Sequence, residues 1–420
     1  MSARLCILAV AAFVTGGGAP AVARVQEATV ASVAVEAPTT ERLAMNVRIF
    51  DGVWKEVRDR YYDPGLHGVD WDAAGEAWRP QALAATTDRA LYAALRSMLR
   101  LLDDTHANVM EPAAARRQDA ARLSRAVMGV TLALQDSGVW RIEQVRAGSP
   151  AEAAGVMPGW VLADVDGETW GPDLEVVDGR PTRLGLLDDA GVRRDITLTP
   201  RVMEPPPLFI ADRTRPGVAV LTIAAFRPGL GAWMGEQLAA IPADDAVILD
   251  LRGNPGGHLA EADAVLSCFL PRGRAWATRT ARSGRHAVMR TSGGCGSLRR
   301  PAANEVVVLV DASSRSAAEL TPAALQEAGR ALIVGRKTAG AVLIAQETDL
   351  PDGGRMILSR FDFITIGGTR LEKQGVIPDL EAETSPEDRR VQRDPALDAA
   401  VEAVSARRAA AAALAAAKAA

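Results

Sequence analysis

The sequence predicts an α/β fold in which a mainly parallel sheet follows a helical N-terminal cap and an inserted, β-rich domain. Three observations support this prediction. Apolar residues recur at helix spacing between residues 45 and 102, strand-like runs joined by turns fill residues 126–200, and wholly apolar runs alternate with helical patterns after residue 217. Buried strands alternating with helices are typical of a parallel sheet that is covered on both faces.

The length and charge of the chain limit the class of protein. A chain of 420 residues is expected to form two or three packed units. Its formal net charge of −4 arises from 48 basic and 52 acidic residues spread along the chain. Such a balance lacks the basic surface that nucleic-acid binding requires, so we expect no nucleic-acid partner.

The first 23 residues have the pattern of a signal peptide. Arg4 precedes an apolar run from Leu5 to Val14, and small residues lead to Ala23. The apolar run is shorter than a membrane-spanning helix needs, so we expect no stable membrane insertion. Residues 24–44 are aperiodic and are expected to form a mobile lead-in. This pattern predicts an exported protein, periplasmic or secreted.

The remaining domain boundaries follow from changes in periodicity. The helical cap is expected at residues 45–118 and the β-rich domain at residues 119–203. The run Met203–Pro207 is proline-rich and predicts a stiff linker. The α/β core is expected at residues 208–393, followed by an Ala-rich helical tail at residues 394–420.

The cysteines and histidines argue against a metal site. Cys268 and Cys295 remain after the signal peptide, either as a disulfide in an oxidising compartment or as two buried thiols. No Cys/His spacing resembles a metal site, and the four histidines are scattered along the chain. We therefore expect neither a metal nor another cofactor.

The segment Val306–Gly335 indicates a possible nucleophile. It predicts a buried strand, a polar turn, a helix and a second strand, with Ser316 where the helix begins. Unpaired amides and the helix dipole at that point would stabilise negative charge on a reacting oxygen. A structural alternative is that Ser316 and Glu319 only form a capping box.

Three further segments carry candidate functional groups. The glycine-rich run Asp250–Gly257 follows a buried strand, and its amides could converge on an anion, although a tight strand-to-helix turn is the alternative. His106 lies in the run Leu101–Val109, and Glu372 lies in the run Leu371–Leu380. Either side chain could be merely structural or solvated.

Taken together and in this order, these segments resemble the C-terminal processing peptidases and the tricorn core protease, a superfamily of serine peptidases. The resemblance extends from about residue 45 to residue 380. It rests on DLRGNPGG at 250–257, SRSAAEL at 314–320 and GVIPDL at 375–380. The stretches MGVTL, GSPAEAAGV and PGW between residues 128 and 160 resemble an inserted PDZ domain.

The resemblance implies a role for each matching residue. Ser316 would be the nucleophile, and the amide of Ala317 with one from Gly256 or Gly257 would form the oxyanion hole. The backbone of Met128, Gly129 and Val130 would bind the terminal carboxylate of a peptide that adds a strand to the PDZ sheet.

One departure from the family pattern concerns the general base. Processing peptidases carry a lysine 25 residues after the serine, and this position is Ala341, which cannot accept a proton. The tricorn-like branch resembles this chain at Thr105-His106 and at Glu372. The resemblance therefore implies a Ser316–His106–Glu372 system, in which a carboxylate fixes the imidazole that takes the proton from serine.

These implications predict a serine endopeptidase that cleaves peptides or unfolded proteins through an acyl-enzyme. Two alternatives stay open. An inactive member would bind peptide C-termini through its PDZ domain as a scaffold or chaperone, and a small-substrate hydrolase would act on esters or short peptides.

Overall fold

The computed structural model describes residues 37–123, 126–135, 137–171, 174, 176–391 and 393–419. The predicted signal peptide at residues 1–23 and most of the predicted lead-in lie outside the described residues. In the described part of the chain, no helix is both long and apolar enough to cross a membrane.

The N-terminal segment is helical. It contains α1 (Thr40–Arg60), the short 3₁₀ helix η1 (Leu66–Gly68), α2 (Trp71–Leu83), α3 (Asp88–Leu99), the 3₁₀ helix η2 (Arg100–Leu102), the short strand β1 (Asn108–Met110) and α4 (Pro112–Leu123). Helix α1 begins before Met45, where the apolar periodicity starts, because the Thr39 side chain accepts from the Arg42 amide and caps the helix. The α1–α3 helices bury a shared core that includes Ile49, Tyr92 and Leu95.

A five-stranded antiparallel sheet follows this helical segment. Its strands are β3 (Val130–Leu134), β4 (Trp140–Val145), β5 (Val161–Val165), β6 (Thr182–Leu187) and β7 (Arg193–Leu198), paired in that order, with the one-turn helix α5 (Pro150–Ala153) between β4 and β5. The two chain connections to this unit pair with each other as β2 (Ala126–Val127) and β8 (Arg201–Val202). The unit has its own core around Ile142, Leu184 and Leu186.

The next unit is built on a six-stranded sheet. Its strands are β9 (Phe209–Asp212), β10 (Val218–Ile223), β11 (Ala246–Asp250), β14 (Val306–Val310), β15 (Ala331–Gly335) and β18 (Leu380–Glu381). The order is β18-β15-β14-β11-β10-β9, and every neighbouring pair is parallel except β10 with β9. The central strands contain almost only Val, Ile, Leu and Ala, as expected for strands buried on both faces.

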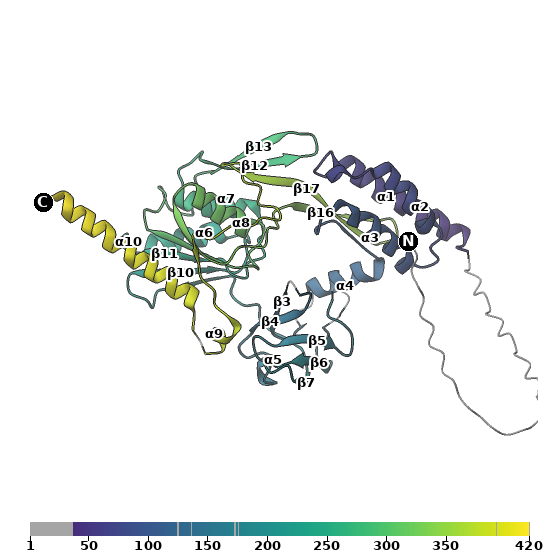
Figure 1. The fold of residues 1–420 in the computed structure, drawn as a ribbon, viewed down its shortest axis with the longest axis horizontal. Coiled ribbons are helices and arrows are strands. Elements are labelled where there is room, and N and C mark those ends of the chain that lie inside the picture. The colour runs from purple at the N-terminus through teal and green to yellow at the C-terminus, as the bar shows by residue number, and fades with distance from the viewer. Residues whose placement is uncertain are drawn as a thin grey trace, which may run out of the picture. The chain divides into compact units, whose positions relative to one another are not determined.

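Alternate residues of these strands enter two separate cores. One core joins Leu221, Leu249 and Val308 to helices α6 (Leu230–Ala240), α7 (Leu259–Phe269) and α8 (Ala317–Glu327), which lie together beside the sheet in Figure 1. The other joins Val220 and Ile248 to the first half of α10 (Pro395–Ala419), so the C-terminal helix contributes to the sheet's second face. The short helix α9 (Pro386–Arg390) precedes it.

A second, antiparallel sheet was not expected from the sequence. It consists of β12 (Ala275–Ala281), β13 (His286–Arg290), β16 (Ile344–Asp349) and β17 (Arg355–Thr365), with β1 of the helical segment paired to β17. Strand β17 therefore joins the N-terminal segment to the α/β unit by backbone pairing. The loop after β17 carries Glu372.

The two remaining cysteines form a disulfide between α7 and the segment that follows β13. Cys268 and Cys295 have their Cα atoms 4.8 Å apart, and both residues are buried. Of the two states that the sequence left open, the structure has the bonded one.

Candidate active site

Ser316 is the N-cap residue directly before α8 and has a rare backbone conformation. Its φ of 54° and ψ of −117° lie outside the regions that non-glycine residues ordinarily adopt. The amide of Ser316 donates to the Ala341 carbonyl at 2.9 Å and to the Glu319 carboxylate at 3.0 Å, which holds the residue in place. Strained residues of this kind cluster at functional sites, because the surrounding structure must maintain them.

The capping box that the sequence offers as a structural role is present. The Ser316 side chain lies on the amide of Glu319, and the Glu319 carboxylate accepts from the Ser316 amide. In this box the Ser316 oxygen acts as an acceptor, so the proton of the hydroxyl can still be donated to a base.

Glu319 does more than cap the helix. It is fully buried, and its two oxygens accept four hydrogen bonds. One oxygen accepts from the Thr338 hydroxyl at 2.6 Å and the Gly340 amide at 2.7 Å, and the other from the Ala341 amide at 2.9 Å and the Ser316 amide. This carboxylate thereby fixes the segment 338–341 against the serine turn.

The glycine-rich loop lies against the same turn. A Cβ on Gly256 would stand 2.7 Å from the Ser316 Cβ and 3.1 Å from the Ala317 nitrogen, so only glycine fits there. The buried Asn254 holds this loop, since its side chain accepts from the Gly256 amide at 2.8 Å and its carbonyl accepts from the Arg315 amide at 3.0 Å. The loop and the serine turn therefore form one rigid unit.

Two amides near Ser316 remain free. The Gly256 amide is occupied by Asn254, whereas the amides of Gly257 and Ala317 have no acceptor among the residues that the structure describes. Gly257 adopts a φ of 147°, where a Cβ would collide with the Phe226 carbonyl at 2.1 Å. Of the glycine amides considered from the sequence, Gly257 is thus the one that can pair with Ala317 as an oxyanion donor.

The segment after Gly340 links the serine to Glu372. Ala341 accepts from the Ser316 amide, and the next residue, Val342, donates its amide to one Glu372 oxygen at 2.9 Å. The Leu343 amide donates to the same oxygen at 3.2 Å. Glu372 is 5% exposed, and its burial raises its pKa, opposed by these amides and by His106. Ala341 thus keeps its backbone place beside Ser316 without supplying a base.

His106 reaches this region from the loop after η2. Its Nδ1 lies 3.9 Å from the free oxygen of Glu372 and 3.3 Å from a carboxylate oxygen of Asp104. The structure therefore brings His106 and Glu372 together, within ion-pair range but beyond a hydrogen bond. No hydrogen bond links His106 to Ser316 within the described residues.

The charges around His106 favour its protonated form. The hydrogen bond to Asp104 has the largest effect and raises the pKa of His106, burial lowers it, and Glu372 raises it again, so that the net shift is upward. The charge of Arg315 lowers the same pKa.

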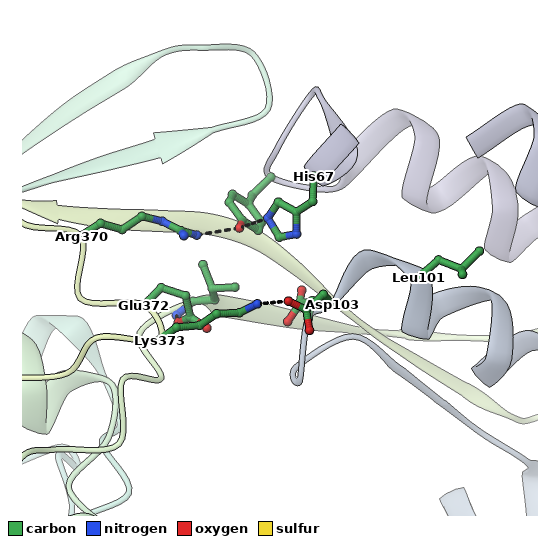
Figure 2. A pocket seen from close by; sticks show the side chains of 9 residues that line it. His67, Leu101, Asp103, Arg370, Glu372 and Lys373 are labelled. Atoms are coloured by element: carbon green, nitrogen blue, oxygen red, sulfur yellow. Dashed lines mark hydrogen bonds and ion pairs between the residues drawn. The ribbon is translucent and has the colours of Figure 1, made fainter. Parts of the chain in front are cut away.

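A cavity of about 270 Å³ has both Asp104 and Glu372 in its lining. Figure 2 shows Lys373 extending toward Asp103, with which it forms an ion pair, next to Glu372. The residues that line the cavity are Tyr62, His67, Leu101, Asp103, Asp104, Leu343, Arg370, Glu372 and Lys373.

A chain of hydrogen bonds across this cavity holds the loop that carries His106. Arg370 donates to the Tyr62 hydroxyl at 2.8 Å, and this hydroxyl meets His67 Nε2 at 2.7 Å (Figure 2). His67 Nδ1 in turn donates to the Leu102 carbonyl at 2.6 Å. Since Leu102 ends η2, the start of the loop is anchored to the segment after β17.

The predicted peptide-binding residues line a different groove. Met128, Gly129 and Val130 border a cavity of about 450 Å³ together with Trp140 and Trp170. The Met128 carbonyl accepts from the Ala151 amide at 2.9 Å, and the Gly129 carbonyl accepts from the Arg146 amide at 2.8 Å. Gly129 has a φ of 94°, and a Cβ there would collide with the Ser149 side chain at 2.1 Å.

Sequence reasoning missed two residues of the site. The sequence contains a signal for Asp104, because it belongs to an acidic pair directly before Thr105-His106, and a carboxylate next to a histidine can orient its ring. Glu319 was interpreted only as a helix cap, and nothing in the sequence pointed to its bonds with the segment 338–341. No group of three or more metal-binding side chains occurs among the described residues.

Comparisons with known proteins match two parts of this chain to family models. Residues 217–382 match the model of peptidase family S41, and residues 47–100 match that of the tricorn protease C1 domain. Residues 217–382 therefore form a peptidase family S41 domain, and this match, with the similar carboxyl-terminal processing proteases, indicates a serine peptidase.

The similar relatives include both branches of that superfamily. The chain is 28% identical to the carboxyl-terminal-processing protease of Synechocystis, covering 82% of this chain and 84% of the relative. It is 27% identical to tricorn protease homolog 1 of Streptomyces coelicolor, covering 86% of this chain. The chain spans only 35% of the length of that homolog.

The solved structures agree on the fold. The photosystem II D1 C-terminal processing protease superposes with a TM-score of 0.64 at 23% identity, over 83% of this chain and 94% of that one. At this identity the likeness shows a shared mixed α/β fold and no more.

Proposed function

We propose that this chain is an exported serine endopeptidase that cleaves peptides or unfolded proteins through an acyl-enzyme. The observation that carries the proposal is the strained Ser316 at the N-terminus of α8, flanked by the free amides of Ala317 and Gly257. Such donors stabilise the oxyanion that forms when a hydroxyl attacks a peptide carbonyl.

His106 serves as the general base in this proposal. Its Nε2 takes the proton from Ser316 and returns it to the leaving amine, and the charge of Glu372 at 3.9 Å stabilises the imidazolium. The Ser316–His106 hydrogen bond would form as substrate closes the site, since such bonds are often long without ligand. Ala341 excludes the lysine base of the processing branch.

The antiparallel domain is proposed to act as a PDZ-like reader of substrate C-termini. The groove beside Met128, Gly129 and Val130 has two tryptophans in its lining and one edge formed by β3. A peptide could extend the sheet at this edge and place its carboxylate against the loop amides. The disulfide between Cys268 and Cys295 supports export, because such bonds persist in oxidising compartments.

The test uses a fluorophosphonate probe and an unfolded protein substrate. We expect the wild type to be labelled and to cleave the substrate, and Ser316→Ala to do neither while remaining folded. Ser313→Ala is the matched control, because Ser313 lies in the same turn and only its amide is engaged, with Asp311. Proteolysis by Ser316→Ala at the wild-type rate would disprove the mechanism.

The loss of the family lysine at Ala341 favours a second candidate, an inactive peptide-binding scaffold. A folded wild type that binds peptide C-termini but neither reacts with the probe nor cleaves substrate would establish it. Turnover of a p-nitrophenyl ester without turnover of unfolded protein would instead indicate a small-substrate hydrolase.

A further inference from the structure

The imidazole of His106 faces two carboxylates at unequal distances. Its Nδ1 lies 3.3 Å from Asp104 Oδ1, within hydrogen-bond reach, and 3.9 Å from Glu372 Oε1. A hydrogen bond weakens steeply beyond the ordinary range, so only the first contact can fix the orientation of the ring.

Asp104 is also held more firmly against the histidine. The same Oδ1 accepts the backbone amide of His106 at 2.8 Å, so the carboxylate binds both the main chain and the ring of one residue. The Asp104 side chain is fully buried, and its geometry cannot relax into solvent. Such a bond selects the tautomer with the proton on Nδ1 and leaves Nε2 free to accept the proton of Ser316.

Glu372 is hydrogen-bonded to a different part of the site. Its Oε2 accepts the amides of Val342 and Leu343, directly after the residue that receives the Ser316 amide. Glu372 therefore braces the serine side of the site, and its influence on His106 is mainly through charge.

The surroundings of Asp104 favour its ionised form. Burial acts to raise the pKa of Asp104, but the His106 ring, the nearby Ser359 hydroxyl and the His106 amide together outweigh it and keep the pKa below its ordinary value. The hydroxyls of Tyr61 and Ser359 face this carboxylate, although neither completes a hydrogen bond of ordinary geometry.

We propose that Asp104 is the positioning residue for His106: it holds the ring in the Nδ1–H tautomer with Nε2 toward Ser316, while Glu372 supplies charge and braces the serine turn. This inference rests on the proposed function only in assigning His106 as the base. The tautomer and the orientation of the ring are properties of the folded chain, with or without turnover.

Several other groups act on the His106–Asp104 pair, and each of them influences the pKa that a titration of His106 would measure. Glu372 acts from the loop after β17 and Arg315 from the turn before α8. The groups that interact with Asp104 are Tyr61 and Tyr62 at the end of α1, Asp103 in its own loop, and Ser359 in β17.

The first measurement needs no substitution at Asp104. NMR of the ring nitrogens in the full chain reports the tautomer of His106 at pH values above the midpoint of its titration. The signals of His106 are assigned by their loss in His106→Gln. We expect the proton on Nδ1. A proton on Nε2 would overturn the proposal, because Asp104 could not then be accepting a bond from the ring.

The second measurement compares three isosteric variants. Asp104→Asn keeps an oxygen that can accept the His106 amide but removes the negative charge. We therefore expect this variant to lower the pH midpoint of the His106 titration more than Glu372→Gln does. We also expect kcat to fall at least about tenfold, within the roughly 10²–10⁴-fold that a positioned base contributes. KM should change little, because Asp104 is buried away from substrate.

Asp103→Asn is the matched control. Asp103 is adjacent in the chain, 85% exposed and paired with Lys373, and its loss should leave the His106 midpoint nearly unchanged. If Asp104→Asn behaves like Asp103→Asn in both midpoint and kcat, the proposal is wrong. If the folded wild type neither reacts with the fluorophosphonate probe nor cleaves the substrate, the proposed function fails, but the tautomer and the titration midpoint of His106 still decide the role of Asp104.

Discussion

Replacing Glu319 by glutamine is expected to destabilise the protein and to impair the serine turn. The carboxylate accepts from the Thr338 hydroxyl and Gly340 amide on one oxygen, and from the Ala341 and Ser316 amides on the other. Glutamine must present an NH₂ group to one of these pairs. An NH₂ group cannot accept a hydrogen bond, so donors lose their partner.

The cost can be worked out for each orientation of the amide. With NH₂ toward the first pair, the hydroxyl can turn to accept, but the Gly340 amide is left buried and unpaired. With NH₂ toward the second pair, Ser316 keeps its bond to the Ala341 carbonyl, but the Ala341 amide loses its acceptor. Either way one buried N–H is left unsatisfied, which costs about 1–3 kcal/mol.

Thermal unfolding and probe labelling together test this expectation. For a unit of 150–250 residues, each kcal/mol lowers Tm by about 2–4 °C, so a decrease of several degrees is expected. Labelling of Ser316 by the fluorophosphonate should slow, because its strained conformation loses support. Glu327→Gln is the control, since Glu327 is on the same helix but exposed, and water can replace its bonds to Thr365 and Gly367. Equal Tm and equal labelling in the two variants would refute the reasoning.

The remaining predictions concern pH, the groove and the disulfide. The raised pKa of His106 predicts that kcat/KM is lost, as pH falls, at a midpoint above the ordinary histidine value of about 6.5, because the base must be neutral. Arg315→Ala removes a charge that lowers this pKa and should move the midpoint further up; a downward shift would contradict the assignment. Gly129→Val, at a φ of 94°, should weaken binding of a peptide with a free C-terminus more than binding of its amide, as fluorescence anisotropy would show. Cys268→Ser with Cys295→Ser should lower the unfolding free energy by roughly 3–4 kcal/mol for a separation of 27 residues, and an unchanged urea midpoint would reject this.

The sequence was sufficient where local pattern decides the structure. The strands around Val308 and Ile333 are continuous apolar runs, and Ser316 lies where such a run gives way to a helix. These features depend on hydrophobic periodicity and turn chemistry within one segment, so they can be recognised without knowledge of the rest of the chain.

Long-range pairing explains what the sequence could not reveal. Strand β17 has Arg360 at its centre, buried and paired with Glu56 of α1, and a charged residue at such a place argues locally against a buried strand. The functional interest of His106 and Glu372 came from family resemblance, because no local pattern distinguishes them from structural or solvated residues. Asp104 became visible only when distances around the imidazole could be compared.

The position of His106 in the helical segment has a consequence for when the site is assembled. The serine with its oxyanion donors and the histidine come from separate stretches of polypeptide, joined through β17 and the loop that follows it. If His106 is the base, as we propose, a chain that is cut between the two stretches, or in which they have not yet docked, would keep the serine turn but lack its proton acceptor. The proposed mechanism therefore makes activity depend on the completed folding of both stretches.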